Sequence, residues 1–109
     1  MNHNKRFSMK YAIDSTPEKI YITIEGRLTY TDYNTFNYIT NAIGEYDNQQ
    51  CVIDLAEVDF IDSAGLGMLL LARDKVSKNK GQIIIKSPQG QVNKMLELSK
   101  FDTIFLIER

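Results

Sequence analysis

The eight residues Phe60–Gly67 read FIDSAGLG and join two apolar segments of different character. On the N-terminal side, the run Cys51–Leu55 is polar only at Asp54, as is typical of a central strand covered on both faces. On the C-terminal side, helical spacing predicts a helix over residues 63–79, closed by lysines and a glycine. The apolar positions assigned to its sheet-facing side are Leu66, Leu69, Leu70 and Val76. The stretch therefore predicts a strand-to-helix connection at the centre of an α/β domain.

The segments on either side of this connection complete the predicted order of elements. Alternating apolar residues predict strands over 7–13 and 20–24, and a buried strand over 82–86. Helical spacing predicts a helix over 32–46, with Phe36, Ile39, Ile43 and Tyr46 on one side. Ser87 and Pro88 are expected to open a last helix, and residues 101–107 a short final element. The inward face of that last helix is assigned to Val92, Met95, Leu96 and Ser99. The order predicts one α/β domain over 7–109, preceded by a flexible tail over 1–6, with a mixed sheet of four to five strands and helices packed against it.

The composition excludes several classes of protein. The chain has 109 residues, of which 43% are hydrophobic and 25% charged, and its net charge is −1. A charge so close to zero gives no field that would attract nucleic acid or an anionic membrane. No apolar run approaches the roughly 20 residues that cross a bilayer, and the start of the chain lacks the apolar centre of a signal peptide. With Cys51 interpreted as a core residue, the sequence predicts a soluble cytoplasmic protein.

The motif around Ser63 does not match a catalytic site. A hydrolase nucleophile elbow requires a glycine two residues before the serine, where this chain has Ile61, and the only histidine is His3 in the predicted tail. A dinucleotide fingerprint requires a further glycine where Leu70 stands, and no phosphate-binding loop is present. The acidic residues from Asp54 to Asp62 lack the spacing of a calcium loop. The sequence therefore predicts no enzyme, no cofactor and no metal.

Asp62 and Ser63 allow two interpretations. In the first interpretation, Asp62 or Ser63 simply caps the helix, a role that stabilises the helix by about 1 kcal/mol. Gly65 and Gly67 need a separate reason, since each costs about 0.5–1 kcal/mol relative to alanine in a helix. Absent side chains would let another backbone or a bulky partner come close to the serine, so the second interpretation is an exposed contact surface. A phosphate on Ser63 would be tolerated at a helix N-terminus while altering that surface.

Nearby residues are candidates for the same contact surface. If the helical face assigned above is correct, Met68 and Leu71 point away from the sheet, and exposed apolar side chains there would suit a protein interface. Ordinary packing under a loop is the alternative for both. Tyr30 and Tyr33 are expected to border this surface.

The residues also resemble a known family. The segment VIDLAEVDFIDSAGLGMLLLARDKV (52–76) is similar to the STAS domain of bacterial anti-sigma factor antagonists, as are IEGRL (24–28), GQIIIKSP (81–88) and LELSKFDTIF (96–105). The likeness runs from about residue 7 to residue 107, and its most specific element is the DSxGLG pattern. It implies a STAS fold and Ser63 as the phosphoacceptor. It also implies an anti-sigma factor with serine kinase activity, which binds the unphosphorylated form and releases the phosphorylated one, and a phosphatase that restores the first state.

The chain departs from the family pattern at two places. Ala64 replaces a second hydroxyl residue found in many members, which leaves Ser63 as the only hydroxyl in the motif. Many members also carry a Gly-Glu-Leu-Asp loop, whereas this chain has Gly26, Arg27, Leu28 and Thr29. We assign Thr29 either a hydroxyl near the site or a role in capping or loop hydrogen bonding. The residues predicted to bind the partner are Asp62, Ser63, Ala64, Gly65, Gly67, Met68, Leu71, Thr29 and Tyr30. A STAS scaffold or transporter-associated subunit that is never phosphorylated remains the alternative function.

Overall fold

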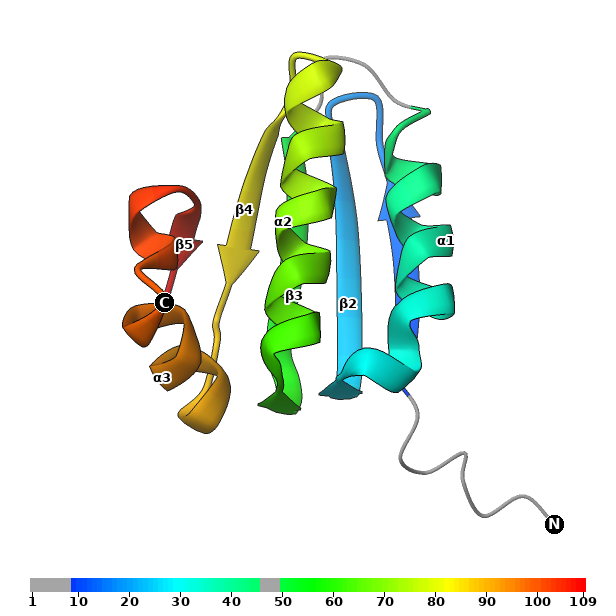
Figure 1. The fold of residues 1–109 in the computed structure, drawn as a ribbon. Helices are drawn as coiled ribbons and strands as arrows, with labels where there is room; N and C mark the ends of the chain where they lie inside the picture. Colours follow the sequence, from blue (N-terminus) through cyan, green and yellow to red (C-terminus); the bar gives the residue numbers. More distant parts are fainter. Residues whose placement is uncertain (1–8, 46–49) are drawn as a thin grey trace, which may run out of the picture.

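The computed structural model describes residues 9–45 and 50–109. It consists of a five-stranded sheet with helices on one face (Figure 1). The spatial order of the strands follows their order in sequence, and β1 runs antiparallel to β2 while the other neighbours run parallel. The strands are β1 (Lys10–Ser15), β2 (Lys19–Leu28), β3 (Gln50–Ile61), β4 (Gln82–Lys86) and β5 (Leu106–Glu108). The helices are α1 (Tyr33–Ile43), α2 (Ser63–Lys78) and α3 (Gly90–Leu98), with short 3-10 helices η2 (Tyr30–Asp32) and η3 (Phe101–Thr103). The predicted α/β class and mixed sheet are confirmed.

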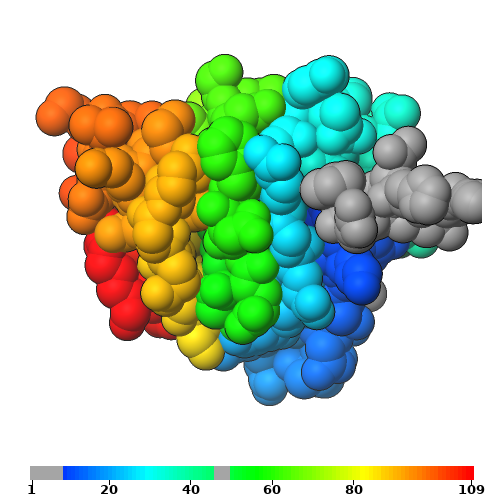
Figure 2. Space-filling view, turned by 90° about the horizontal axis from the view of Figure 1, so that it is seen from below, coloured from blue at the N-terminus to red at the C-terminus, as the bar shows by residue number. Residues whose placement is uncertain are grey.

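One apolar core lies between the sheet and the helices. In β2, Ile20, Ile22 and Ile24 are buried on the helix side, and the residues between them are half-buried on the opposite face. That opposite face carries a polar cluster, in which the Tyr21 hydroxyl donates to Asp54 Oδ2 at 2.7 Å and accepts from Lys86 Nζ at 3.1 Å. α1 and α2 lie side by side across the sheet, and α2 covers β3 (Figure 1). The carboxyl ends of β2 and β3 and the start of α2 thus lie at one end of the molecule, which Figure 2 shows from below.

Several predicted boundaries need correction. β3 continues through Ile61 as one strand, with register shifts against β2 that mark bulges. The last helix begins at Gly90 rather than at Ser87, because Ser87 has φ +54° and its N–H donates to the Glu108 carbonyl. Ser99, predicted to face inward, is exposed at the C-cap of α3. The predicted tail over 1–6, Phe7 and Tyr46 lie outside the described residues.

The buried face of α2 is also rotated from its predicted position. Met68 was expected to point outward and is buried, whereas Leu70 was expected to face the sheet and is 40% exposed. The buried side is centred on the small residues Gly65 and Ala72. The prediction considered large apolar residues alone and so did not place these two on the buried face. Because α2 packs against α1 as well as β3 and β4, its buried face is wider than one stripe. Leu66, Leu69 and Val76 are buried as predicted.

Candidate functional site

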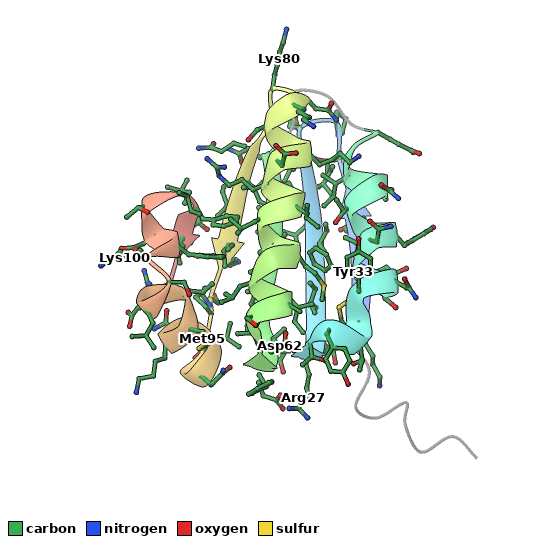
Figure 3. The ribbon with its side chains drawn as sticks, in the orientation of Figure 1. Arg27, Tyr33, Asp62, Lys80, Met95 and Lys100 are labelled. Atoms are coloured by element: carbon green, nitrogen blue, oxygen red, sulfur yellow. The ribbon has the colours of Figure 1, made fainter. Side chains whose placement is uncertain are left out.

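Asp62 joins two segments at the carboxyl end of the sheet. It is the N-cap of α2, and its Oδ1 accepts from the Gly65 N–H at 2.8 Å. Its Oδ2 accepts from the Tyr30 N–H at 3.1 Å, and its own N–H donates to the Leu28 carbonyl. One carboxylate therefore caps the helix and fixes the loop that follows β2, so that both segments lie together (Figure 3). The capping interpretation of Asp62 is thus confirmed.

Ser63 is the first residue of α2, and it is exposed. The capping oxygen belongs to Asp62, so the serine hydroxyl is not needed to satisfy the Gly65 N–H. Gly67 lies one turn further along, and a Cβ built there would meet nothing within 4 Å. Ser63 and Gly67 therefore form an open patch at the front of the helix.

Of the two reasons predicted for the glycines, Gly65 fits the close approach of another backbone and not partner binding. It is buried, and a Cβ at this position would overlap the Leu28 carbonyl oxygen and come within 2.6 Å of Ile61 Cγ1. The missing side chain lets α2 approach the end of β2, which is an internal contact. An opening for an outside partner is therefore ruled out as the reason for this glycine.

The loop between β2 and α1 is held by a buried carboxylate. Asp32 Oδ2 accepts from the Thr29 N–H at 2.9 Å and from the Thr29 hydroxyl at 3.3 Å, while Asp32 Oδ1 accepts from the Met9 N–H at 3.2 Å. The Thr29 and Thr31 hydroxyl oxygens lie 2.9 Å apart. Of the two roles predicted for Thr29, the structure therefore supports the loop hydrogen bond.

Exposed aromatic and aliphatic side chains surround this end of the molecule and the neighbouring helix faces. Tyr30 is 72% exposed, Leu71 is 51% exposed and Tyr33 is 49% exposed. The expected exposure of Leu71 is confirmed, while Ala64 is half-buried against the core. Most of the predicted partner-binding residues thus lie at or near the exposed N-terminal half of α2, and the buried Met68 and Gly65 do not belong to its surface.

Arg27 and Phe60 form a pair beside Asp62 that the sequence did not indicate. The guanidinium carbon of Arg27 lies 4.6 Å from the centre of the Phe60 ring. These two residues line a surface hollow together with Thr29, Tyr30, Thr31 and Asp62. In Figure 3, Arg27 and Asp62 are both labelled at the lower end of the molecule, opposite Lys80. Arg27 and Phe60 face each other on the parallel strands β2 and β3. The sequence could have suggested this pair only if the bulged register of the two strands had been known.

Gln91 is a second residue that the sequence did not indicate. β4 pairs with β3 only as far as Asp54, so among the described residues no strand neighbours the end of β3 on that side. The Ile61 N–H donates to Gln91 Oε1, and Gln91 Nε2 donates to the Ile61 carbonyl, both at 2.9 Å. A side-chain amide thus takes the place of a paired strand directly before the Asp62 cap.

The described residues hold no group of three or more metal-binding side chains. Among the acidic residues near the motif, Asp54 accepts from Tyr21 and from the Ala56 N–H, and Asp62 from the backbone. Among the described residues, every helix is too short or too polar to span a lipid bilayer. Burial raises the pKa of the Cys51 thiol to about 12, consistent with its prediction as a core residue.

These features define a small α/β domain that presents a capped helix N-terminus with an exposed serine. The model of the STAS domain family matches residues 10–109. The chain belongs to the STAS domain family.

Known proteins of this class are similar over most of the chain. A STAS-domain containing protein of Pseudomonas aeruginosa is 30% identical over 83% of this chain and 88% of its own length. BtrV of Bordetella bronchiseptica, a candidate anti-sigma factor antagonist, is 24% identical over 89% of this chain and 84% of its own.

Solved structures show the same fold. An anti-sigma factor antagonist from Mycobacterium paratuberculosis superposes with a TM-score of 0.81 at 18% identity, covering 92% of this chain and 85% of its own. The anti-sigma factor antagonist SpoIIAA in its unphosphorylated form gives a TM-score of 0.76 at 20% identity, covering 92% of this chain and 89% of its own. SpoIIAA of Bacillus has also been solved in a phosphorylated form, with a TM-score of 0.69 at 19% identity, covering 92% of each chain.

Proposed function

We propose that this protein is an anti-sigma factor antagonist that changes partners when Ser63 is phosphorylated. The unphosphorylated form binds an anti-sigma factor with serine kinase activity in the cytoplasm and so frees a sigma factor. That kinase phosphorylates Ser63, and a serine phosphatase reverses the modification. The protein acts as a binding module and as the substrate of these two enzymes.

The exposure of Ser63 at the first position of α2 carries the proposal. A kinase can reach a serine that is exposed, and the hydrogen bonds by which Asp62 caps α2 and fixes the loop after β2 do not involve the Ser63 hydroxyl. A phosphate placed there adds about −1.5 to −2 charges. The helix N-terminus stabilises such a charge by about 0.3–1 kcal/mol, so the fold tolerates the modification.

The same charge disfavours a partner that covers Ser63. The partner would have to desolvate a phosphate beside the Asp62 carboxylate, and such juxtapositions of like charge cost several kcal/mol. A loss of about 3 kcal/mol is more than a hundredfold in affinity. The proposed contact surface consists of Asp62, Ser63, Ala64, Gly67, Leu71, Thr29 and Tyr30. It differs from the sequence-based set by omitting the buried Gly65 and Met68.

Intact-mass spectrometry after incubation with ATP and each candidate anti-sigma kinase of the source organism tests the proposal. We expect a single added phosphate in the wild type and none in Ser63→Ala. Ser77→Ala is the matched control, because Ser77 is also exposed and lies in the last turns of the same helix. Phosphate retained in Ser63→Ala would contradict the assignment. If every kinase leaves the wild type unmodified, the scaffold function is favoured instead.

A further inference from the structure

Arg27 is a cation without an anionic partner in the part of the chain that the structure describes. The described ion pairs join Lys78 to Asp74 and Arg109 to Glu97, and none involves Arg27. Its Nε is buried and has no hydrogen-bond acceptor among those residues. A buried donor left without an acceptor is unfavourable, and because this Nε is closed to solvent, an external acceptor reaches the guanidinium through its terminal nitrogens.

The position of the guanidinium is set by the Phe60 ring, which it faces at 4.6 Å. Stacking on an aromatic face leaves the planar edge of an arginine free for hydrogen bonds, and this edge fits a carboxylate in a bidentate manner. The hydroxyl residues Thr29 and Thr31 line the same hollow. Beside the Asp62 carboxylate, the hollow therefore combines a fixed cation with neutral polar groups.

Asp62, which also lines the hollow, does not supply the missing anion. Its Oδ1 and Oδ2 accept from the N–H groups of Gly65 and Tyr30, and it makes no ion pair to Arg27. It does limit the charge that the hollow accepts. The Arg27 and Asp62 charges in the lining sum to zero, so a dianion such as phosphate meets more repulsion here than a group with a single negative charge.

We propose that the hollow binds one aspartate or glutamate side chain of the protein that docks over Ser63, with Arg27 as the residue that recognises it. This inference rests on the proposed function, since it names the chemistry of that partner's contact. The hollow adjoins the switch serine through Asp62, so both are covered by one docking protein. The incoming carboxylate supplies the acceptor that the guanidinium lacks.

The carboxylate contact is tested on the protein alone by two-dimensional NMR of the arginine Nε–H groups. The probes are the blocked peptide acetyl-Ala-Glu-Ala-amide, its glutamine analogue, and inorganic phosphate at equal ionic strength. We expect the glutamate peptide to shift the Arg27 signal in a saturable manner and the glutamine peptide to leave it unchanged. A stronger response to phosphate, or no response to the glutamate peptide, overturns the carboxylate assignment whether or not any kinase binds.

The partner contact is tested by affinity measurements with the anti-sigma kinase that phosphorylates Ser63. We expect Arg27→Gln to weaken binding by about thirtyfold or more, since truncating one member of a desolvated charge pair has such effects. Arg109→Gln is the matched control, because it removes the same charge from an exposed arginine in the C-terminal strand region. Denaturant unfolding of both variants separates a loss of contact from a loss of fold.

A charge exchange identifies the pair. Arg27→Glu should abolish binding, and replacement of one acidic residue of the kinase by arginine should restore it. Equal affinity of wild type and Arg27→Gln, with Ser63 still phosphorylated by the kinase, would overturn the inference and leave the proposed function intact.

Discussion

Gly65 and Gly67 lie two positions apart in α2, but the first is closely packed and the second is open on its outer side. Gly65 faces the end of β2, where a Cβ would overlap the Leu28 carbonyl oxygen. Gly67 faces open space. The first glycine is therefore required by the fold, and the second leaves room on the outer surface.

Alanine substitutions at these two glycines should change stability in opposite directions. We expect Gly65→Ala to lower the free energy of unfolding by about 1–3 kcal/mol, because the contacting oxygen belongs to the backbone and cannot rotate away. Gly67→Ala should raise it by about 0.5–1 kcal/mol through helix propensity. Urea unfolding of the two variants beside the wild type measures both. A stabilising Gly65→Ala would show that the close approach of α2 to β2 is absent.

Cys51 gives a prediction for alkaline pH. Burial raises the pKa of its thiol from the ordinary value of 9.0 to about 12. Between these values the unfolded chain releases a proton that the folded protein keeps, so the thiol lowers the free energy of unfolding by about 1.4 kcal/mol per pH unit. Below pH 9 both states hold the proton and the effect vanishes. The difference between wild type and Cys51→Ala, followed by denaturant unfolding across this range, isolates the thiol. A pH-independent difference would contradict the burial.

At the scale of secondary structure, β3 positions the site because it extends beyond the end of β4. The backbone of Ile61 is satisfied on that side by the amide of Gln91, and Asp62 follows at once as the helix cap. Gln91, at the start of α3, thus supports the turn after Ile61, a residue 30 positions away in sequence.

Removal of this amide should loosen the end of β3. We expect Gln91→Leu to lower the free energy of unfolding by about 1–3 kcal/mol, because it leaves the Ile61 N–H and carbonyl without partners. Hydrogen exchange should show faster exchange at the Ile61 amide. Gln89→Leu serves as the control, since Gln89 is exposed and its side chain donates one bond, to the Ser87 carbonyl. Unchanged protection of Ile61 in Gln91→Leu would contradict the role of the amide.

The elements could be predicted from the sequence because their signals are local. The alternation in β2 and the cap, glycines and apolar spacing around α2 identify strand and helix without tertiary information. The sequence did not predict the rotation of α2. The burial of Met68 depends on the elements that pack against α2, and the burial of Gly65 depends on the end of β2. The start of α3 was missed because Ser87 adopts a left-handed conformation that a tertiary hydrogen bond to β5 supports.

The candidate site also contains residues that the sequence predicts and residues that only tertiary contacts bring together. Asp62 and Ser63 follow from their position before an apolar helix, which is a sequence property. Arg27 and Phe60 meet across strands whose register is shifted by bulges, and Gln91 reaches Ile61 across a gap in the sheet. Contacts of this kind depend on the register of distant segments, so single-sequence periodicity does not reveal them.

For the molecule as a whole, the central claim is that one phosphate added at one end changes binding without changing the fold. Ser63 is exposed at the first position of α2, and the side-chain hydrogen bond that caps this helix is accepted by Asp62. The most direct measurement compares the affinity of the same anti-sigma kinase for the unmodified protein and for protein carrying phosphoserine at position 63, with circular dichroism of both. We expect identical spectra and binding weakened by about a hundredfold or more. Equal affinity of the two forms would contradict the account.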